Sequence, residues 1–239
     1  MALTMVIAES ALQLVPEEIQ VHPQIKQYAR RREKAAGEVL LDRAFHDLAM
    51  RKLARVHYRI PPERMGRPDI VHNTLLQVLE TPLNWEGQLQ VFVHTQDDHV
   101  IWINPTIRLP KNYTRFVGLL EHLYKEKQVP NRSEPLLRLY RADLPHLIQQ
   151  LKPTKVLGFS TLGQPMLMRN VAMLTGGLRE PLVVIGGFPR GHFSSKTRGV
   201  MDGIYAVDRQ SLDAWVVAGR FIYDFEWSIG LAETRLKDA

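Results

Sequence analysis

The residues best suited to hold a ligand lie in one short segment, residues 182–193 (LVVIGGFPRGHF). Its apolar start, residues 182–185, predicts a buried strand, and Gly186, Gly187 and Gly191 follow closely. Glycines after a strand let the backbone take a positive φ and let a ligand approach main-chain N–H and C=O groups. The segment therefore predicts either a ligand-binding loop or an ordinary turn, and the glycines alone do not separate the two.

Two familiar phosphate-binding loops do not fit this spacing. A dinucleotide loop requires G-x-G-x-x-G, and a P-loop requires G-x-x-x-x-G-K-[ST]. Gly186 and Gly191 have the P-loop spacing, but His192 and Phe193 stand where the lysine and the hydroxyl residue would be. The phosphate clamp and the magnesium ligand of a P-loop are therefore missing.

Basic residues gather in three groups along the chain. The sharpest group consists of Arg108, Lys111 and Arg115, around the start of a predicted helix. A helix N-terminus already attracts anions, so added cations are unfavourable for the helix itself, and an RNA phosphate would explain them. A locally satisfied surface is the alternative. The other groups are residues 26–34, a kind of run that is most often a solvated helix face, and residues 51–67.

Other chemistries find little support in the sequence. The nine histidines are dispersed without an H-E-x-x-H motif, so no metal site is predicted. Residues 97–99 (DDH) suit a hairpin turn better than a cation site. Residues 67–69 (RPD) combine a fixed kink with a potential ion pair, and the simplest interpretation of Asp69 is a helix cap. There is no G-x-S-x-G nucleophile elbow.

The composition indicates a folded protein with a basic surplus. A hydrophobic content of 45% and 239 residues suffice for one large domain or two small ones. Lysine and arginine (31) outnumber aspartate and glutamate (25), which suggests a polyanionic partner, although such a surplus also occurs without one. The lack of cysteine excludes disulfides and thiolate zinc sites. No apolar run or signal-peptide pattern points to a membrane, so a cytoplasmic protein is expected.

Strand and helix patterns alternate along the chain, which predicts an α/β fold. Strands are expected at residues 3–7, 88–94, 100–103, 155–159, 182–185 and 203–207, and helices at 38–55, 72–79, 113–127 and 211–225. The second and third strands flank residues 97–98, which predicts a hairpin. Asn112 is the expected N-cap of the third helix. Residues 131–135 are the expected linker between a basic N-terminal part and a more apolar C-terminal part.

Six motifs in a fixed order resemble one family across nearly the whole chain. They are residues 67–72 (RPDIVH), 94–98 (HTQDD), 103–105 (INP), 108–116 (RLPKNYTRF), 185–191 (IGGFPRG) and 212–215 (LDAW). Each motif is weak alone, but the composite is similar to the Nep/Emg family of ribosome-biogenesis proteins, of the archaeal type. The resemblance implies a SPOUT-class methyltransferase that uses S-adenosylmethionine to methylate N1 of a pseudouridine in small-subunit ribosomal RNA.

The resemblance also implies the fold and the assembly. SPOUT proteins have a parallel sheet flanked by helices and a C-terminal deep trefoil knot, which the general rarity of knots would not predict. We therefore expect an N-terminal extension and a single SPOUT methyltransferase domain over residues 1–239, with a basic helical insertion at 16–66 and a cofactor-binding knot part at 153–239. The implied partners are small-subunit ribosomal RNA, a second copy of the chain and small-subunit ribosomal proteins.

By the same resemblance, the cofactor sits in the knot between three loops. The implied cofactor-binding residues are Phe159, Ser160, Gly186, Gly191, Val207, Asp208, Arg209, Gln210, Ser211 and Leu212. The implied RNA-contacting residues are Arg67, Asp69, Arg108, Lys111 and Arg115. The family usually has arginine where Lys111 stands, and lysine keeps the charge but loses the bidentate fork. The substrate uridine is expected to be splayed out of its stack into a pocket.

The implied chemistry demands little from the protein. The N1 of pseudouridine must lose a proton as the sulfonium methyl is transferred in line, and positioning can supply much of the acceleration. Asp69 is the candidate catalytic residue, either orienting the base or accepting its proton. The alternative function is a non-catalytic RNA-binding assembly factor for the small ribosomal subunit. The glycine loop favours the enzyme, whereas residues 207–212 match the family poorly and leave room for the alternative.

Overall fold

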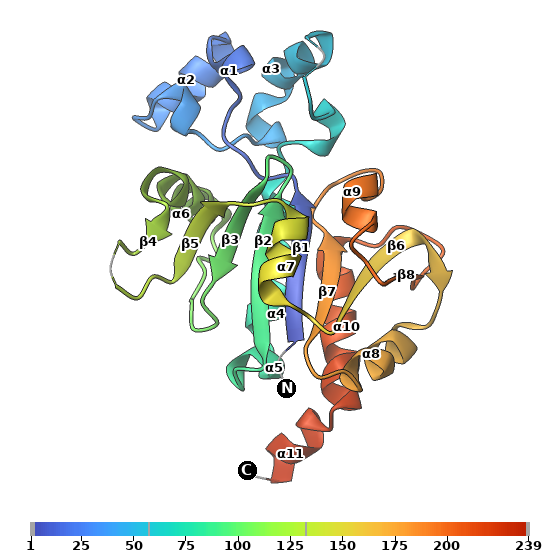
Figure 1. Cartoon of the computed structure of the whole chain (residues 1–239). Coiled ribbons are helices and arrows are strands. Elements are labelled where there is room, and N and C mark those ends of the chain that lie inside the picture. Colours follow the sequence, from blue (N-terminus) through green and yellow to red (C-terminus); the bar gives the residue numbers. More distant parts are fainter. Residues whose placement is uncertain (1–2, 57, 132, 238–239) are drawn as a thin grey trace.

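The structure is a computed structural model that describes residues 3–56, 58–131 and 133–237. Eight strands form one sheet in the order β4-β5-β3-β2-β1-β7-β6-β8 (Figure 1). The strands are β1 (Leu3–Ser10), β2 (Leu89–Thr95), β3 (His99–Ile103), β4 (Gln128–Val129), β5 (Leu137–Arg141), β6 (Lys155–Pro165), β7 (Pro181–Gly186) and β8 (Gly203–Ala206). β1 pairs with β2 and β7, and β6 pairs with β7 and β8, all in parallel. The pairs of β2 with β3, β3 with β5, and β5 with β4 are antiparallel.

The α/β prediction is confirmed, and the expected parallel sheet describes five of the eight strands. The antiparallel part begins with the predicted hairpin, in which β2 and β3 flank the turn at residues 97–98. The expected linker at residues 131–135 is wrong, because the described part of it lies in the connection between β4 and β5 of the same sheet. Residue 132 lies outside the described residues.

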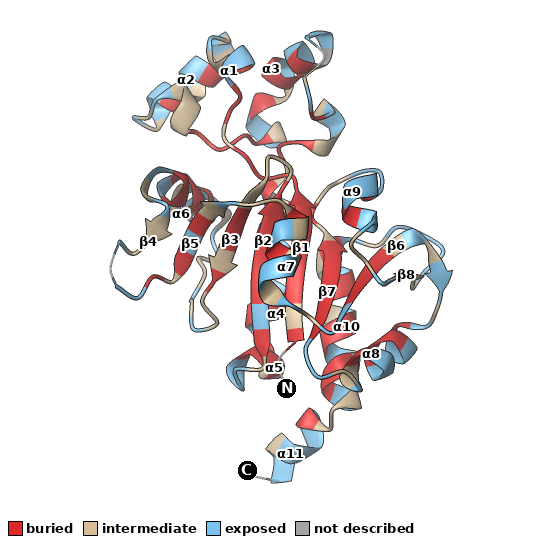
Figure 2. Ribbon diagram, in the orientation of Figure 1, coloured by how far each residue is buried: buried red, intermediate tan, exposed pale blue. Residues whose placement is uncertain are grey.

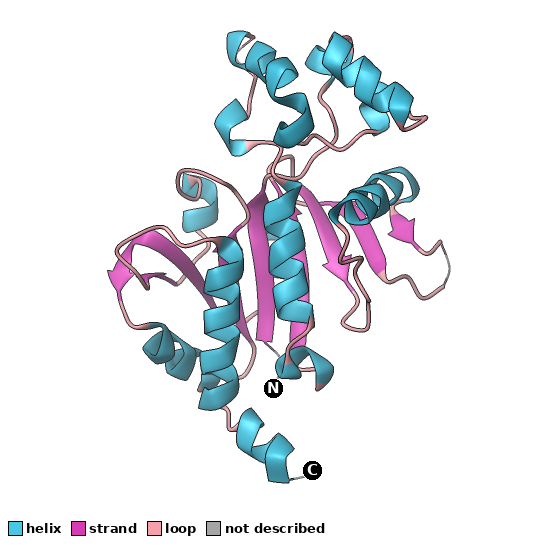
Figure 3. Cartoon of the chain, turned by 180° about the vertical axis from the view of Figure 1, so that it is seen from behind, coloured by secondary structure: helices cyan, strands magenta, loops and turns pink. Residues whose placement is uncertain are grey.

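Helices cover both faces of the sheet. The helices are α1 (Glu17–Gln20), α2 (Pro23–Arg31), α3 (Arg43–Arg55), α4 (Pro68–Leu79), α5 (Pro82–Trp85), α6 (Tyr113–Glu126), α7 (Leu144–Leu151), α8 (Met168–Gly176), α9 (Ser195–Arg198), α10 (Ala214–Ser228) and α11 (Leu231–Lys237). Seen from behind, α4 and α10 run along one face and α6 lies beside them (Figure 3). The opposite face carries α7 and α9 (Figure 1). No helix in the described ranges is long and apolar enough to cross a membrane.

The central strands are buried on both sides. Met5 and Ile7 of β1 contribute to the core under α4, α6 and α10, whereas Val6 and Ala8 pack in the core under α7. Because successive side chains of a strand point to opposite faces, a nearly continuous apolar strand fits between two helical layers. Figure 2 shows this burial concentrated in β1, β2 and β7.

Residues 16–56 and 58–66 form a helical layer beyond the C-terminal end of β1 (Figure 1). It has a separate apolar cluster, which includes Ile19, Ile25 and Met50. The helix expected over residues 38–55 begins later, at α3. The carboxylate of Asp42 caps α3 by accepting the N–H of Ala44 at 2.9 Å.

Two further helix starts differ from the sequence patterns. Helix α4 begins at Pro68 rather than at residue 72, because a proline at the first helical position needs no N–H partner. Helix α10 begins at Ala214 rather than at residue 211, and it extends to Ser228. The predicted cap of α6 is confirmed, since Asn112 Oδ1 accepts the N–H of Arg115 at 3.0 Å.

Candidate active site

A cavity of about 290 Å³ opens at the C-terminal end of β7, beside β6. Three segments far apart in the sequence form its wall, and α4 closes one side. The lining residues are Arg67, Ile70, Phe159, Ser160, Thr161, Ile185, Gly186, Phe188, Pro189, Gly191, His192, Phe193, Ser211, Leu212, Asp213, Ala214, Trp215 and Val217. Ligands of open α/β sheets bind at the carboxyl ends of parallel strands, which is where this cavity lies.

In the glycine segment, the backbone has a conformation and a packing that residues other than glycine would disturb. A Cβ on Gly187 would lie 2.2 Å from Ser10 Oγ and 2.9 Å from Ser10 Cα. The close approach is fixed by backbone hydrogen bonds: Gly187 N–H donates to Ala8 O at 2.8 Å, and Ala11 N–H donates to Gly187 O at 2.9 Å. Gly191 has a φ of +84°, a region that favours glycine. The loop is therefore tied to the end of β1 and shaped by two glycines.

The implied cofactor-binding residues divide into three sets. Those that line the cavity are Phe159, Ser160, Gly186, Gly191, Ser211 and Leu212. Val207, Asp208 and Gln210 line a smaller hollow of about 70 Å³, which shares six lining residues with the cavity. Arg209 lines neither space. The structure thus brings two of the three expected loops together and places most of the third beside them.

The candidate residues from the sequence left out several cavity residues, among them Ile70, Thr161 and Trp215. Trp215 belongs to the motif at residues 212–215, so this motif was the available signal. The late start of α10 leaves residues 211–213 outside the helix, where they reach the cavity. Contact of Ile70 with the cavity depends on how α4 packs, which local sequence patterns do not encode.

Arg67 and Asp69 form a two-pronged ion pair beside the cavity. Arg67 Nε lies 2.8 Å from Asp69 Oδ1, and Arg67 Nη2 lies 2.7 Å from Asp69 Oδ2. These contacts raise the pKa of the Arg67 guanidinium above its usual range. Asp69 lies in the first turn of α4, but the helix has no side-chain cap, so the capping interpretation is wrong. Because both carboxylate oxygens hold Arg67, the geometry favours an orienting role for Asp69 over a free proton acceptor.

The loop before α6 and the first turn of α6, together called the basic loop, lie beside the same helix. Its exposed cations are Arg108, Lys111 and Arg115, and they form no ion pair within the described residues. His72 of α4 fixes this loop: its Nε2 lies 2.8 Å from Pro110 O, and its ring stacks on Phe116 at 4.3 Å. Helix α4 therefore connects the cavity, through Arg67, with the basic loop.

Arg32 and Lys34, from the basic run expected to be a solvated helix face, form ion pairs inside the molecule. Arg32 Nη2 and Lys34 Nζ lie 2.8 Å and 2.6 Å from Glu121 Oε2, and Glu121 is almost completely buried in α6. The second carboxylate oxygen accepts the N–H of Leu40 at 3.1 Å. The interpretation of residues 26–34 as a solvated face is therefore wrong at these two positions, which join the helical layer to α6.

The acidic turn at residues 97–99 is held by local hydrogen bonds. Thr95 Oγ1 donates to Asp97 Oδ1 at 2.5 Å and accepts the N–H of His99 at 3.0 Å. The hairpin interpretation is confirmed. Across the described residues there is no group of three or more His, Asp or Glu side chains placed to hold a metal ion.

Comparison with known proteins identifies the family to which this arrangement belongs. A family model described as EMG1/NEP1 methyltransferase matches residues 5–226. This chain belongs to the EMG1/NEP1 methyltransferase family. The resemblance inferred from the six motifs is thereby confirmed.

Relatives of the EMG1/NEP1 family match over nearly their whole length. The ribosomal RNA small subunit methyltransferase Nep1 of Pyrococcus furiosus is 41% identical over 95% of this chain and 97% of its own. The protein of the same name from Thermococcus onnurineus is 45% identical over 94% and 98%. A crystal structure of Archaeoglobus fulgidus Nep1 bound to S-adenosylhomocysteine has a TM-score of 0.81 and 31% identity, covering 95% of this chain and 99% of that one. The shared EMG1/NEP1 fold thus includes the helical layer as well as the sheet.

Proposed function

We propose that this chain methylates N1 of a pseudouridine in small-subunit ribosomal RNA with S-adenosylmethionine as the methyl donor. Family membership makes it a methyltransferase, and the names of its relatives indicate the RNA substrate. The observation that carries the proposal is the cavity, which has a glycine-shaped wall on one side and the Arg67–Asp69 pair on the other. The Archaeoglobus fulgidus relative was solved with S-adenosylhomocysteine, the product that remains after methyl transfer.

The cavity residues suit this cofactor. Phe159, Ile185 and Leu212 offer apolar surface for an adenine ring, and the loop after β7 offers backbone groups for its polar edge. Gly191 keeps this backbone in a conformation that a side chain would strain. When bound, S-adenosylmethionine supplies an electrophilic methyl group on a sulfonium. The residues proposed to hold it are the ten named above, of which Arg209 has the least structural support.

The RNA-contacting residues can act at two distances from the cavity. Arg67 lies at the cavity edge, where Asp69 fixes its guanidinium. The basic loop extends this charge outward along α4, where it would hold phosphates on either side of the target nucleotide. The target base, splayed out of its stack, would then enter beside Arg67.

The reaction forms an N1–CH₃ bond, breaks the S–CH₃ bond and releases the N1 proton. Arg67 would stabilise the negative charge that develops on the base as the proton leaves, because a fixed cation in a partly desolvated site needs no reorganisation. Asp69 keeps the guanidinium in place with both of its carboxylate oxygens, and the N1 proton is released to solvent. Positioning supplies the remaining acceleration.

We further infer that the protein works as a homodimer. Tyr223 and Trp227 of α10 lie four residues apart on one helix face, and they are 65% and 64% exposed. The opposite face of α10, with Phe221 and Phe225, is fully buried. Helix α10 is therefore not an entirely internal helix, and its exposed apolar stripe suits contact with a second copy.

Other parts of the proposal follow from the family resemblance. We infer a single domain over residues 1–239, with residues 16–66 as an insertion and residues 153–239 as a knotted part. The convergence of the loops around residues 160, 188 and 212 on one cavity supports the knot. Ribosomal RNA as substrate favours a cytoplasmic location, with small-subunit ribosomal proteins as neighbours.

The test combines cofactor binding with a methylation assay. We expect the native protein to bind S-adenosylhomocysteine in calorimetry and to methylate a pseudouridine-containing RNA but not its uridine counterpart. Uridine carries the glycosidic carbon on N1 and has no proton to lose there, so equal methylation of both RNAs would contradict the proposed chemistry. Asp69→Asn should slow methyl transfer while leaving cofactor binding intact. RNA binding without cofactor binding would instead support the non-catalytic assembly factor.

A further inference from the structure

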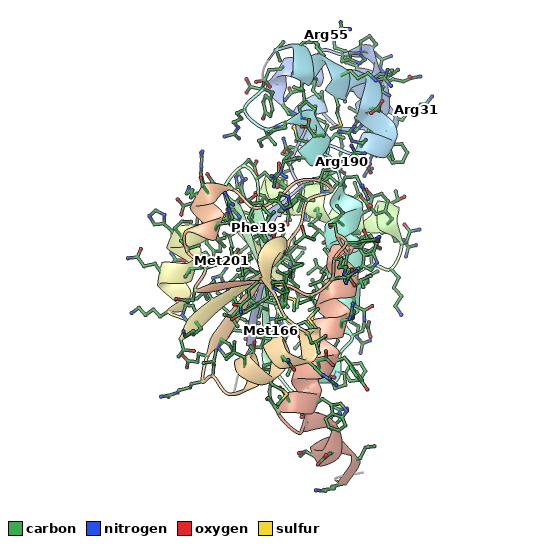
Figure 4. All side chains as sticks on the ribbon, turned by 90° about the vertical axis from the view of Figure 1, so that its right-hand side faces the viewer. Arg31, Arg55, Met166, Arg190, Phe193 and Met201 are labelled. Carbon is green, nitrogen blue, oxygen red and sulfur yellow. The ribbon has the colours of Figure 1, made fainter. Side chains whose placement is uncertain are left out.

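Arg64 lies at the junction between the helical layer and the loop after β7. It ends the 3-10 turn Pro62–Arg64, and its guanidinium reaches across to the body of the molecule. Arg64 Nη1 donates to His192 O at 2.7 Å, and the guanidinium lies 4.1 Å from the ring centroid of Phe188. Figure 4 labels Arg190 and Phe193 of the loop after β7, which lie below the helical layer.

Glu9 completes the junction from the end of β1. Its Oε2 accepts from Arg64 Nη2 at 2.8 Å, and its Oε1 accepts the N–H of Ser194 at 2.9 Å. Glu9 has a φ of +50°, which is unfavourable for a residue with a side chain and requires support from its surroundings. The Arg64 and Glu9 side chains are only 19% and 10% exposed, so their charges interact with little screening by water.

The junction contacts the loop after β7 on the side that faces away from the cavity. Arg64 does not line the cavity, but Phe188 and His192, which it contacts, both do. Gly191 lies between them, and a Cβ on Gly191 would be 3.6 Å from Arg64 Nη1. Ser194, held by Glu9, follows directly after the lining residues. Both the middle and the far end of the loop are therefore anchored by one ion pair.

We infer that Arg64 is a positioning residue that sets the affinity for the cofactor from outside the cavity. The inference rests on the proposed function and adds to it a role for the helical layer in cofactor binding. Without the guanidinium, the carboxylate of Glu9 loses its counter-ion, and the carbonyl of His192 loses a charged donor. The loop would then sample more conformations, and binding would have to order it again.

The first test measures S-adenosylhomocysteine affinity by calorimetry and thermal stability for matched variants. We expect Arg64→Ala to weaken binding about tenfold, the effect of losing one charged hydrogen bond. Arg59→Ala removes the same charge from an exposed neighbour without an ion pair in the described residues, and it should change affinity less than about twofold. Arg64→Lys keeps the positive charge beside Glu9 but loses the forked guanidinium that also reaches His192. The affinity of this variant should therefore lie between those of the native protein and Arg64→Ala.

Kinetics separate positioning from a general loss of structure. With Arg64→Ala we expect the KM for S-adenosylmethionine to rise about tenfold, while kcat at saturating cofactor stays within about twofold. A folded variant with native affinity and native KM would overturn the inference. If the native protein itself does not bind S-adenosylhomocysteine, the proposed function fails instead.

A measurement on the native chain covers the case in which Arg64→Ala does not fold. Hydrogen exchange is compared with and without S-adenosylhomocysteine. We expect the ligand to slow exchange in residues 186–194 and also in residues 60–65, because the Arg64 contacts couple the two segments. Protection confined to residues 186–194 would show that the helical layer does not respond to the cofactor, and the inference would be wrong.

Discussion

Gly187 and Gly191 shape the same loop for different physical reasons. Gly187 is required by space, because its missing side chain lets the loop pack against Ser10. Gly191 has room for a Cβ, with Arg64 Nη1 as its nearest neighbour at 3.6 Å, but its φ of +84° disfavours other residues. The sequence pattern pointed to both glycines without distinguishing these causes, because space and φ are set by the folded backbone.

Gly191→Val should lose both stability and cofactor affinity. The strained φ should lower the free energy of unfolding by about 2 kcal/mol, and S-adenosylhomocysteine binding should weaken at least about tenfold. Gly87→Val is the matched control, since Gly87 has a φ of +65° with no atom within 4 Å of a Cβ and lies away from the cavity. Urea unfolding and calorimetry should show similar destabilisation in both variants and weaker binding only at Gly191. Unchanged affinity in folded Gly191→Val would exclude this loop from the cofactor site.

His46 predicts an acid-sensitive step in stability. Burial lowers its pKa to about 4 from a usual value of 6.5, and its Nδ1 accepts the N–H of Asp42 at 3.0 Å. His46 is therefore protonated below about pH 6.5 in the unfolded chain, but only below about pH 4 in the folded chain. The stability contributed by neutral His46 is complete above pH 6.5 and is lost as the pH falls through this window, by about 2 kcal/mol at pH 5.

The measurement is urea unfolding at pH 7.5 and pH 5 for the native chain and His46→Asn. The variant should lose about 2 kcal/mol less than the native chain between the two pH values. Burial raises the pKa of the neighbouring Asp42 carboxyl, which favours the folded state as the pH falls. This opposite effect is common to both proteins, so the difference between them isolates His46. Equal losses would show that His46 titrates normally in the folded chain.

At the scale of elements, α6 joins the basic loop to the helical layer. Its Glu121 binds Arg32 and Lys34, and Tyr113 in its first turn donates a hydrogen bond to Asp42 at 2.5 Å. The apolar spacing of α6 and its cap at Asn112 were predictable, because both depend on neighbours in sequence. The partners of Glu121 were not predictable, because they lie 87 and 89 residues away along the chain.

Glu121→Gln should weaken the contact between α6 and the helical layer. Removing the buried charge leaves Arg32 and Lys34 without a counter-ion, which should lower the free energy of unfolding by about 3 kcal/mol. Glu38→Gln is a control, because Glu38 pairs with Lys125 at an exposed site and should leave stability unchanged. Chemical denaturation of both variants checks this expectation, and equal stability would mean that Glu121 is not the main electrostatic link.

The basic loop should contribute to RNA binding through its charge. Replacing Arg108, Lys111 and Arg115 together by alanine should weaken RNA binding and flatten its salt dependence by about one unit of slope for each phosphate contact removed. Cofactor affinity should not change, since none of the three lines the cavity. An unchanged slope would identify the loop as a solvated surface.

The control for this prediction removes the same charge elsewhere. Lys152, Lys155 and Arg179 are exposed cations near the starts of β6 and β7, at the opposite end of the parallel strands from the cavity. Their triple alanine variant should keep the native slope. Filter binding across a range of salt concentrations with one RNA measures both variants, and equal losses would indicate attraction by net charge alone.

At the scale of the whole molecule, local patterns predicted six of the eight described strands, but they missed β4 and β5 and did not predict the order of the strands in the sheet. β1 pairs with β2 and β7, whose partner residues lie 86 and 178 positions along the chain, as in Leu3 with Leu89 and Thr4 with Leu182. No periodicity within a window of sequence encodes such a pairing, so the residues alone pointed to the loop after β7 but not to the two distant segments that complete the cavity. The family resemblance supplied the arrangement, because six separated motifs carry information about the whole fold.

The proposed dimer depends on the exposed stripe of α10, in which Val216, Tyr223 and Trp227 recur at helical spacing. Trp227→Glu would place a charge in the centre of an apolar contact, where desolvation without a partner is costly. We expect the native chain to sediment as a dimer at micromolar concentration and Trp227→Glu to sediment as a folded monomer.

The control is Leu48→Glu, which changes a similarly exposed residue on α3 and should remain dimeric. Because the stripe lies on the helix whose first turn lines the cavity, the monomer should also bind S-adenosylhomocysteine more weakly. A native monomer would contradict the proposed dimer, and a dimer that persists in Trp227→Glu would place the contact elsewhere.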